Sequence, residues 1–154
     1  MTRFELFKFL HVVGAIAWVG GGLGLTILAR RLVVARDHAT LQAINAQGKA
    51  LGNWLFMPAF VLTLGFGIAM VADTPAYGFF DTWIVVGYGG ILLSGAFEGL
   101  IGQRAAKGFT EAIEQHGPGS PKAQAAASRV TLGGWLDVLT LLVVVFAMVV
   151  KPGA

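Results

Sequence analysis

Cysteine is absent from this 154-residue chain, and charged residues make up only 12% of it. The absence of cysteine excludes disulfides, zinc–thiolate sites and thiol catalysis. The scarcity of charge excludes an ordinary soluble domain, in which about a quarter of the residues are charged. Because 56% of the residues are hydrophobic, a single domain over residues 1–154 has too little interior to bury them all. Soluble-enzyme signatures, such as a phosphate-binding glycine loop, are missing as well.

Four apolar stretches are present instead, each close to the roughly 20 residues that a helix needs to cross hydrocarbon. They cover residues 4–29, 54–72, 80–101 and 132–150. Ala15-Ile16-Ala17 resembles a signal-peptide cleavage site. However, the apolar run before it is too short and the hydrophobicity continues past it, so we expect no cleavage. The sequence predicts an all-α fold, a four-transmembrane-helix bundle in the lipid bilayer.

Lysine and arginine indicate the orientation of the spans. Residues 30–53 and 102–129 carry four basic residues each, whereas residues 73–79 carry none. Since basic loops stay in the cytoplasm, both termini are predicted to lie outside, in a bacterial-type inner (cytoplasmic) membrane. The net charge of +3 then points to anionic lipid head groups and not to nucleic acid.

The two basic segments contain their own structural signals. Residues 37–53 have helical spacing behind an aspartate, so the membrane helices are expected to continue beyond the bilayer. Residues 117–121, Gly-Pro-Gly-Ser-Pro, predict a break. His38 and His116 fall in these segments, and both are predicted to be exposed to solvent.

Two of the ionisable residues in the predicted spans need an explanation. His11 lies about 10 Å into the first span, on one helix face with Glu5, Lys8 and Trp18. Because an ionisable group in hydrocarbon needs a partner or a function, His11 is predicted to serve in ligation or proton chemistry. A neutral imidazole bonded to a neighbouring helix is the alternative. Asp137, one turn inside the fourth span, should be protonated, paired or next to water, unless that helix starts later.

Glycines are expected to cluster near the depth of His11, at positions 14, 65, 67, 87, 89 and 90. Small residues let membrane helices approach closely, and the spacings Gly20 to Gly24 and Gly95 to Gly99 fit the same interpretation. The alternative is that the missing side chains leave room for a planar cofactor beside His11, with hydrogen bonds from Thr63 and Tyr88. A homodimer through one glycine face is compatible with either.

Three segments carry a resemblance to known membrane proteins. Residues 9–21 have a leucine–histidine start followed by a Trp-x-Gly element. Residues 57–65 combine a proline, a threonine and a glycine in one helix, and residues 137–152 form a last helix with an acidic start and a Lys-Pro end. In order and spacing they resemble the HemJ/CopD-like superfamily of small four-helix bacterial membrane proteins. It includes HemJ-type protoporphyrinogen oxidases, CopD-like copper proteins and a predicted integral membrane family of unassigned function.

The resemblance implies haem b with His11 as the axial ligand to the haem iron. Trp18, Thr63, Gly87, Tyr88 and Asp137 would then line the cofactor. HemJ-type oxidases also use a third-helix lysine, and Gly87 stands at that position here. This departure weakens the argument that the chain is an oxidoreductase related to protoporphyrinogen oxidase. It makes the family of unassigned function the closer match.

Three functions therefore remain open. The first is a haem-b- or porphyrin-associated redox membrane protein, whose second ligand would be Lys8, Met148 or a residue of a partner chain. The second is copper or small-solute transport. Soft Cu(I) prefers sulfur ligands, and the methionines are scattered along the sequence. The third is a non-catalytic subunit of a membrane complex, in which His11 and Asp137 make polar contacts between helices.

Overall fold

The computed structural model describes residues 1–153, and in this range the chain is helical with no strand. Its helices are α1 Arg3–Ala35, α2 His38–Ala46, α3 Gly48–Leu51, α4 Met57–Asp73, α5 Thr82–Phe97, α6 Gln103–His116 and α7 Pro121–Val150. Two π-helical turns, η1 Gly52–Phe56 and η2 Glu98–Gly102, join α3 to α4 and α5 to α6 without a break. Four long apolar rods result, each able by length and composition to cross a membrane. The predicted all-α, four-helix architecture is confirmed.

The rods are longer than the apolar stretches that predicted them. The third rod, Thr82–His116, has 35 residues and therefore measures about 50 Å, whereas the hydrocarbon of a bilayer is about 30 Å thick. The prediction that helices continue past the spans is confirmed. So is the break after α6, where Gly117 adopts a φ of +82° that a residue with a side chain rarely adopts.

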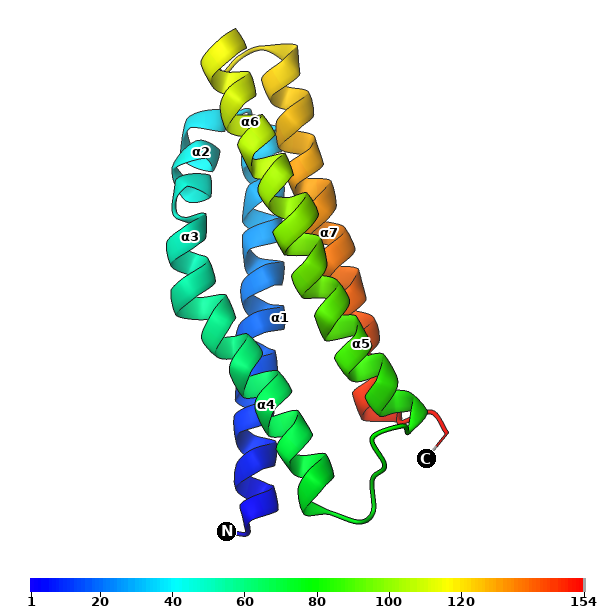
Figure 1. The fold of residues 1–154 in the computed structure, drawn as a ribbon. Helices are drawn as coiled ribbons and strands as arrows, with labels where there is room; N and C mark the ends of the chain where they lie inside the picture. Colours follow the sequence, from blue (N-terminus) through cyan, green and yellow to red (C-terminus); the bar gives the residue numbers. More distant parts are fainter. Residues whose placement is uncertain (154) are drawn as a thin grey trace.

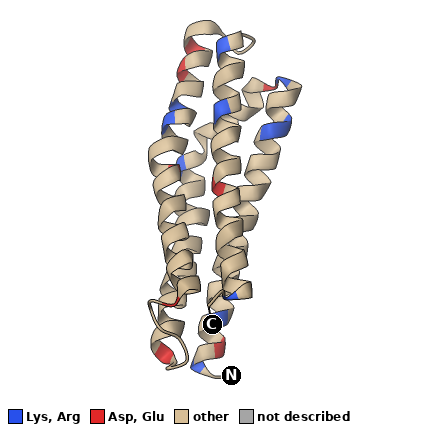
Figure 2. Ribbon diagram, turned by 90° about the vertical axis from the view of Figure 1, so that its right-hand side faces the viewer, with Lys and Arg blue, Asp and Glu red and all other residues tan. Residues whose placement is uncertain are grey.

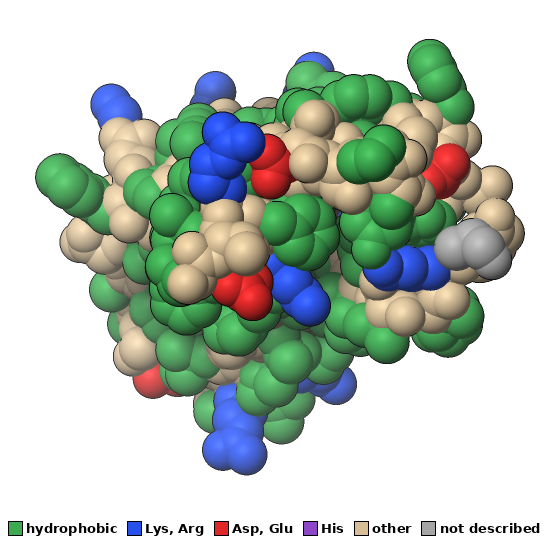
Figure 3. All heavy atoms as spheres, turned by 90° about the horizontal axis from the view of Figure 1, so that it is seen from below, with side chains coloured by type: hydrophobic (Ala, Val, Ile, Leu, Met, Phe, Trp, Pro, Cys, Tyr) green, Lys and Arg blue, Asp and Glu red, His purple; other side chains and the backbone are tan. Residues whose placement is uncertain are grey.

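The rods pack as two pairs joined along one side. α1 packs along α4, α5 packs along α7, and α1 and α7 connect the pairs (Figure 1). The backbones of α4 and α5 stay apart, and these two helices meet through side chains, where Val71 packs with Trp83 and Ile84. The N- and C-terminal ends of the described chain lie at the same end of the bundle. Charged residues gather at the two ends and are sparse between them (Figure 2). At the terminal end, basic and acidic side chains lie among hydrophobic ones (Figure 3).

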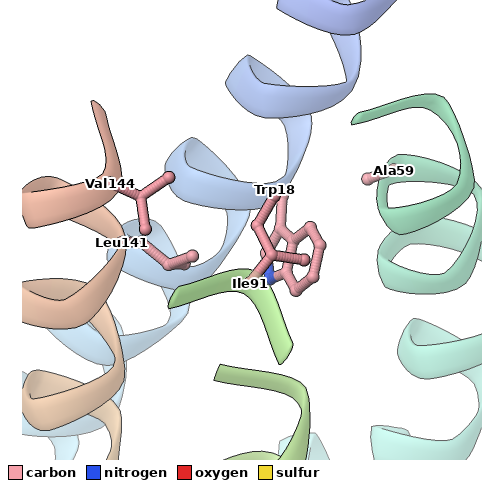
Figure 4. Packing of buried hydrophobic residues seen from close by; sticks show 5 residues of the cluster. All are labelled: Trp18, Ala59, Ile91, Leu141 and Val144. Carbon is pink, nitrogen blue, oxygen red and sulfur yellow. The ribbon is translucent and has the colours of Figure 1, made fainter. Parts of the chain in front are cut away.

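The inner and outer surfaces of the rods are both apolar. Inside, the indole of Trp18 packs with residues from the other three rods: Ala59, Ile91, Leu141 and Val144 (Figure 4). Outside, large hydrophobic side chains are exposed along every rod, among them Ile16, Val61, Leu92 and Val143. Apolar side chains on the outer surface of an apolar helix are those that contact lipid.

A second core lies at the end opposite the termini. α6 is strongly amphipathic, and its fully buried Phe109 packs with Val33, Leu41 and Ala127. Because the rods extend beyond membrane thickness, this end needs its own water-excluding core. His38 belongs to it: the side chain is only 3% exposed, so the prediction that His38 is solvated was wrong. The prediction for His116 is confirmed, since that residue is exposed.

Candidate functional site

The imidazole of His11 contacts α4. Its Nδ1 lies 2.6 Å from the backbone carbonyl oxygen of Thr63. The ring reaches α4 because Gly67 has no side chain: a Cβ there would lie 3.0 Å from His11 Nδ1. A carbonyl oxygen only accepts, so Nδ1 carries the hydrogen and donates it. In the neutral ring, this leaves the lone pair of Nε2 unused by the contact with Thr63.

His11 lines a groove between α4 and α5, where the two helix pairs diverge. The other walls are mainly aliphatic and aromatic side chains, including Leu64, Ile84 and Ile91. The cavity has a volume of about 60 Å³. The site is thus a narrow apolar groove with one imidazole in its wall.

The structure brings four of the predicted site residues together and leaves two apart. His11, Thr63, Gly87 and Tyr88 all line the groove. Trp18 lies in the core between all four rods, where its ring centroid is 5.4 Å from that of Phe60. Asp137 pairs with α5, away from the groove.

The space beside Gly87 is filled. The terminal methyl of Met148, on α7, occupies the position that a Cβ at residue 87 would take. Met148 therefore lines the groove itself, as does Met70 on α4. The methionines are scattered in the sequence, but the fold places two thioethers in the same cavity as His11.

Some of the glycines near His11 face another helix closely and others face open space. Gly14 allows the closest approach of α1 to α4, since a Cβ there would lie 2.7 Å from Thr63 Oγ1 and 2.8 Å from Thr63 N. Gly65 and Gly89 would meet nothing within 4 Å, so the six glycines do not form one packing layer. The spaced pairs at 20/24 and 95/99 likewise have nothing within 4 Å of a Cβ. They therefore make no close contact within the described chain, and the homodimer stays a prediction.

Asp137 is tied to α5 inside the apolar part of the bundle. Ser94, which is 1% exposed, donates its hydroxyl hydrogen to Asp137 Oδ1 at 2.5 Å. Sequence reasoning found the aspartate but missed the serine, because a serine in an apolar helix usually bonds to its own backbone.

The end of the groove nearest the termini is aromatic and was not predicted. The rings of Tyr77 and Trp83 meet edge to face with centroids 5.1 Å apart. Lys151 Nζ donates to the Tyr77 hydroxyl at 2.9 Å. Among the described residues, Trp83 Nε1 is the one buried side-chain nitrogen or oxygen that has no hydrogen-bond partner. Tyr77 and Trp83 line the groove, and the three residues together form what we call the groove mouth.

Comparison with known families gives a match over nearly the whole chain. A family model described as a predicted integral membrane protein, DUF2269, matches residues 5–152. No curated protein and no solved structure matches the chain.

Proposed function

The chain belongs to the DUF2269 family of predicted integral membrane proteins, and on that premise we propose that it is a redox protein that binds haem b or a related porphyrin beside His11. One observation carries the proposal. The Thr63 carbonyl holds His11 by Nδ1, and metal-ligating histidines are oriented by such a contact at the nitrogen that does not bind the metal. Nε2 would then be the atom of this chain that holds the haem iron.

Met148 is the best candidate for a second ligand in this chain. Its thioether lines the groove with His11, and methionine with histidine is an established axial pair for haem iron that raises the reduction potential. Bound haem would supply one-electron chemistry. The chain would contribute the two ligands, the orientation of the imidazole and an apolar, water-poor environment.

The donor set and the apolar walls fit a porphyrin, but the volume does not fit it without movement. The cavity of about 60 Å³ is far below the roughly 300–1,000 Å³ of pockets that enclose such ligands. The proposal therefore includes a separation of α5 from α4. That movement would break the cluster that Val71 of α4 forms with Trp83 and Ile84 of α5, so a bound porphyrin would have to replace these apolar contacts with its own.

Absorption spectra of protein purified in mild detergent test the proposal. We expect a Soret band in the wild type and in His116→Ala, the exposed-histidine control, and its loss in His11→Ala. Circular dichroism must show that all three proteins are folded. Full retention of haem by folded His11→Ala would exclude His11 as the ligand.

Copper is the second candidate, because the fold gathers Met70, Met148 and His11 around one cavity. Two thioethers and an imidazole are ligands that suit Cu(I). Metal analysis of the same preparations separates the two functions, since copper would bind without a Soret band. If folded protein holds neither haem nor copper, the non-catalytic subunit is favoured, and the contacts of His11 and Asp137 between helices account for both residues.

The proposed location is the bacterial inner membrane, with both termini outside. Support comes from the two basic segments, which meet at the end of the bundle opposite the termini (Figures 1 and 2). Since the chain has no cysteine, single replacements can be labelled cleanly. Gln47→Cys should react only from the cytoplasm and Ala76→Cys only from outside; both positions are exposed. The reverse labelling pattern would show that both termini lie in the cytoplasm and would contradict the proposed topology.

A further inference from the structure

We propose that this protein binds an anionic phospholipid on its outer surface, with the lipid phosphate on Arg129 and an acyl chain in a second groove, between α5 and α7. This site is separate from the groove beside His11 and does not depend on the function proposed for it. Two features of the outer surface carry the proposal. One is a level of the bundle at which every rod has a basic residue, and the other is an apolar groove beneath one of these residues.

The basic residues at this level form what we call the cation belt. It lies towards the end of the bundle opposite the termini and consists of five exposed residues: Arg30, Arg31, Lys49, Arg104 and Arg129. Each of the four rods contributes at least one of them. Among residues 1–153, none of the five forms an ion pair with a carboxylate; the ion pairs there join Arg3 to Asp73 and Lys107 to Glu111. The belt is therefore open to an anion from outside the chain.

A contact between α1 and α7 fixes the level of the belt. These helices are antiparallel, and a Cβ at Gly134 would lie 2.6 Å from the Thr26 hydroxyl oxygen. Five residues beyond this contact, away from the termini, α1 has reached Arg31 and α7 has reached Arg129. Because the helical rise is the same in both, the two arginines are level.

Contacts of the other two rods bring their basic residues to the same level. Gly21 of α1 faces the ring of Phe56, and seven residues beyond this contact the second rod has reached Lys49. From the hydrogen bond between α5 and α7 at Asp137, a similar count brings the third rod to Arg104. Both residues thus lie within about 5 Å of the level of the two arginines, measured along the bundle.

The cation belt lies one hydrocarbon thickness from the terminal end. From Arg129 to Val150, α7 rises by about 32 Å, and the hydrocarbon of a bilayer is about 30 Å thick. Trp54, which is 85% exposed, lies five residues from Lys49, and tryptophan is enriched at the boundary between hydrocarbon and head groups. The belt is therefore at the level of lipid phosphates.

The second groove lies on the outer surface and has a volume of about 400 Å³. Its lining includes Gly89, Gly90, Leu93, Thr140 and Val143. Leu93 and Val143 are 51% and 59% exposed, so lipid can reach it. The hydroxyl of Thr140 donates to the Leu136 carbonyl of its own helix. The lining therefore has no side-chain donor in need of a partner, which suits a hydrocarbon chain.

Arg129 and this groove are aligned along α7. Thr140 follows Arg129 by eleven residues, which is close to three full turns, so both lie on the same face of the helix. Their separation along the axis is about 16 Å, and one leaflet contributes about 15 Å of hydrocarbon, half of the roughly 30 Å core. A phospholipid with its phosphate at Arg129 would thus have the end of an acyl chain in the groove.

Charge selects an anionic phospholipid as the occupant. Arginine binds phosphate through paired, charge-assisted hydrogen bonds, and the rest of the cation belt favours a head group with a net negative charge. A second copy of the chain is a poorer occupant. In the same orientation in the membrane, it would bring its own belt to the same level, and like charges facing each other oppose association.

Native mass spectrometry of the full chain in mild detergent tests the head-group contact. The protein is titrated with dioleoyl phosphatidylglycerol and with dioleoyl phosphatidylcholine, which have the same acyl chains. We expect the wild type to prefer phosphatidylglycerol. Arg129→Gln should lower the affinity for that lipid about fivefold, the effect of one basic residue near an anionic lipid. Lys122→Gln, an exposed control on the same helix beyond the belt, should not.

Gly89→Leu tests the acyl-chain contact. A Cβ at Gly89 would meet nothing within 4 Å, so leucine can fill the groove without a clash in the fold. We expect it to weaken the binding of both lipids equally and to retain the preference for phosphatidylglycerol. Gly22→Leu, where a Cβ also meets nothing within 4 Å, is the control on α1. Circular dichroism must show that each variant is folded.

Three results would overturn the proposal. Equal affinities of Arg129→Gln and Lys122→Gln would refute the phosphate contact. Unchanged lipid binding by folded Gly89→Leu would refute the acyl-chain site. A wild-type dimer that Gly89→Leu converts to a monomer would show that a second copy occupies the groove. The two variants act on separate parts of the lipid, so each provides a test even if the other does not fold.

Discussion

Replacement of His38 by leucine should destabilise the end of the bundle opposite the termini, although it exchanges a polar residue for an apolar one in a core. The imidazole links two corners of the fold that are far apart in sequence. Nδ1 contacts the carbonyl oxygen of Pro118, and Nε2 lies 2.7 Å from Gln124 Oε1. Both oxygens are acceptors, so a neutral ring, with one N–H, donates to one of them at a time. The Gln124 amide is fixed in turn, because its Nε2 donates to the Val33 carbonyl at 3.2 Å. The ring also meets that of Phe109 edge to face, with centroids 6.1 Å apart.

The expected loss of unfolding free energy is about 2 kcal/mol. An unsatisfied buried acceptor costs about 1–3 kcal/mol. Leucine offers no N–H, so the oxygen to which the imidazole donates loses its donor. The cost is larger at the half-buried Gln124 Oε1 than at the carbonyl of the exposed Pro118, which regains water. Leucine has a comparable volume and recovers part of the loss through burial of apolar surface.

Unfolding of the detergent-purified protein, followed by circular dichroism in a denaturant titration, measures this effect. His116→Leu is the matched control, and as an exposed replacement it should change the free energy by less than about 0.5 kcal/mol. A double-mutant cycle with Gln124→Ala should show a coupling of about 1 kcal/mol. Equal stability of the His38→Leu and His116→Leu proteins would refute the assignment of a buried hydrogen-bonded link.

Three further predictions concern helix contacts. Gly14→Val should destabilise the protein by about 1–3 kcal/mol and weaken the contact of His11 with Thr63, because the new Cβ would clash with Thr63. The control Gly22→Val has open space around it and should cause neither effect. Ser94→Ala should cost about 1–3 kcal/mol by leaving the Asp137 carboxyl without its donor; an unchanged unfolding midpoint would contradict this. Asp37 caps the N-terminus of α2, and the hydroxyl and backbone N–H of Thr40 lower its pKa. Its contribution to stability is therefore complete above the unfolded-state pKa and is lost as the pH falls through the lowered value. Asp37→Asn should therefore flatten the stability profile below about pH 4, and an unaltered profile would show that the cap does not titrate.

The fold was predictable because its signals are local. An apolar run of about 20 residues specifies a membrane helix wherever it stands, so the four spans could be placed without knowledge of their neighbours. The break at residues 117–121 was equally local. His11 was found for the same reason, since an imidazole inside such a run is unusual regardless of what surrounds it.

The errors and omissions came from contacts between distant segments. His38 looked like an ordinary loop residue, and its burial depends on Pro118 and Gln124, 80 and 86 residues away. At Gly87 the sequence left both close packing and an open space as interpretations, and a methionine from another helix fills the position. Ser94 gave no signal in the sequence, because its role depends on the carboxylate that faces it.

By itself, the sequence determined that this chain crosses a membrane, how many times it does so, and which titratable residue lies at depth. Hydrophobic length and spacing decide these properties one segment at a time. Only the tertiary structure decided that His11 is held by a carbonyl of α4, that two methionines share its groove, and that Trp83 lies beside Lys151 with an unpaired donor. These features depend on the crossing and rotation of helices, which close packing between apolar surfaces sets and no single segment encodes.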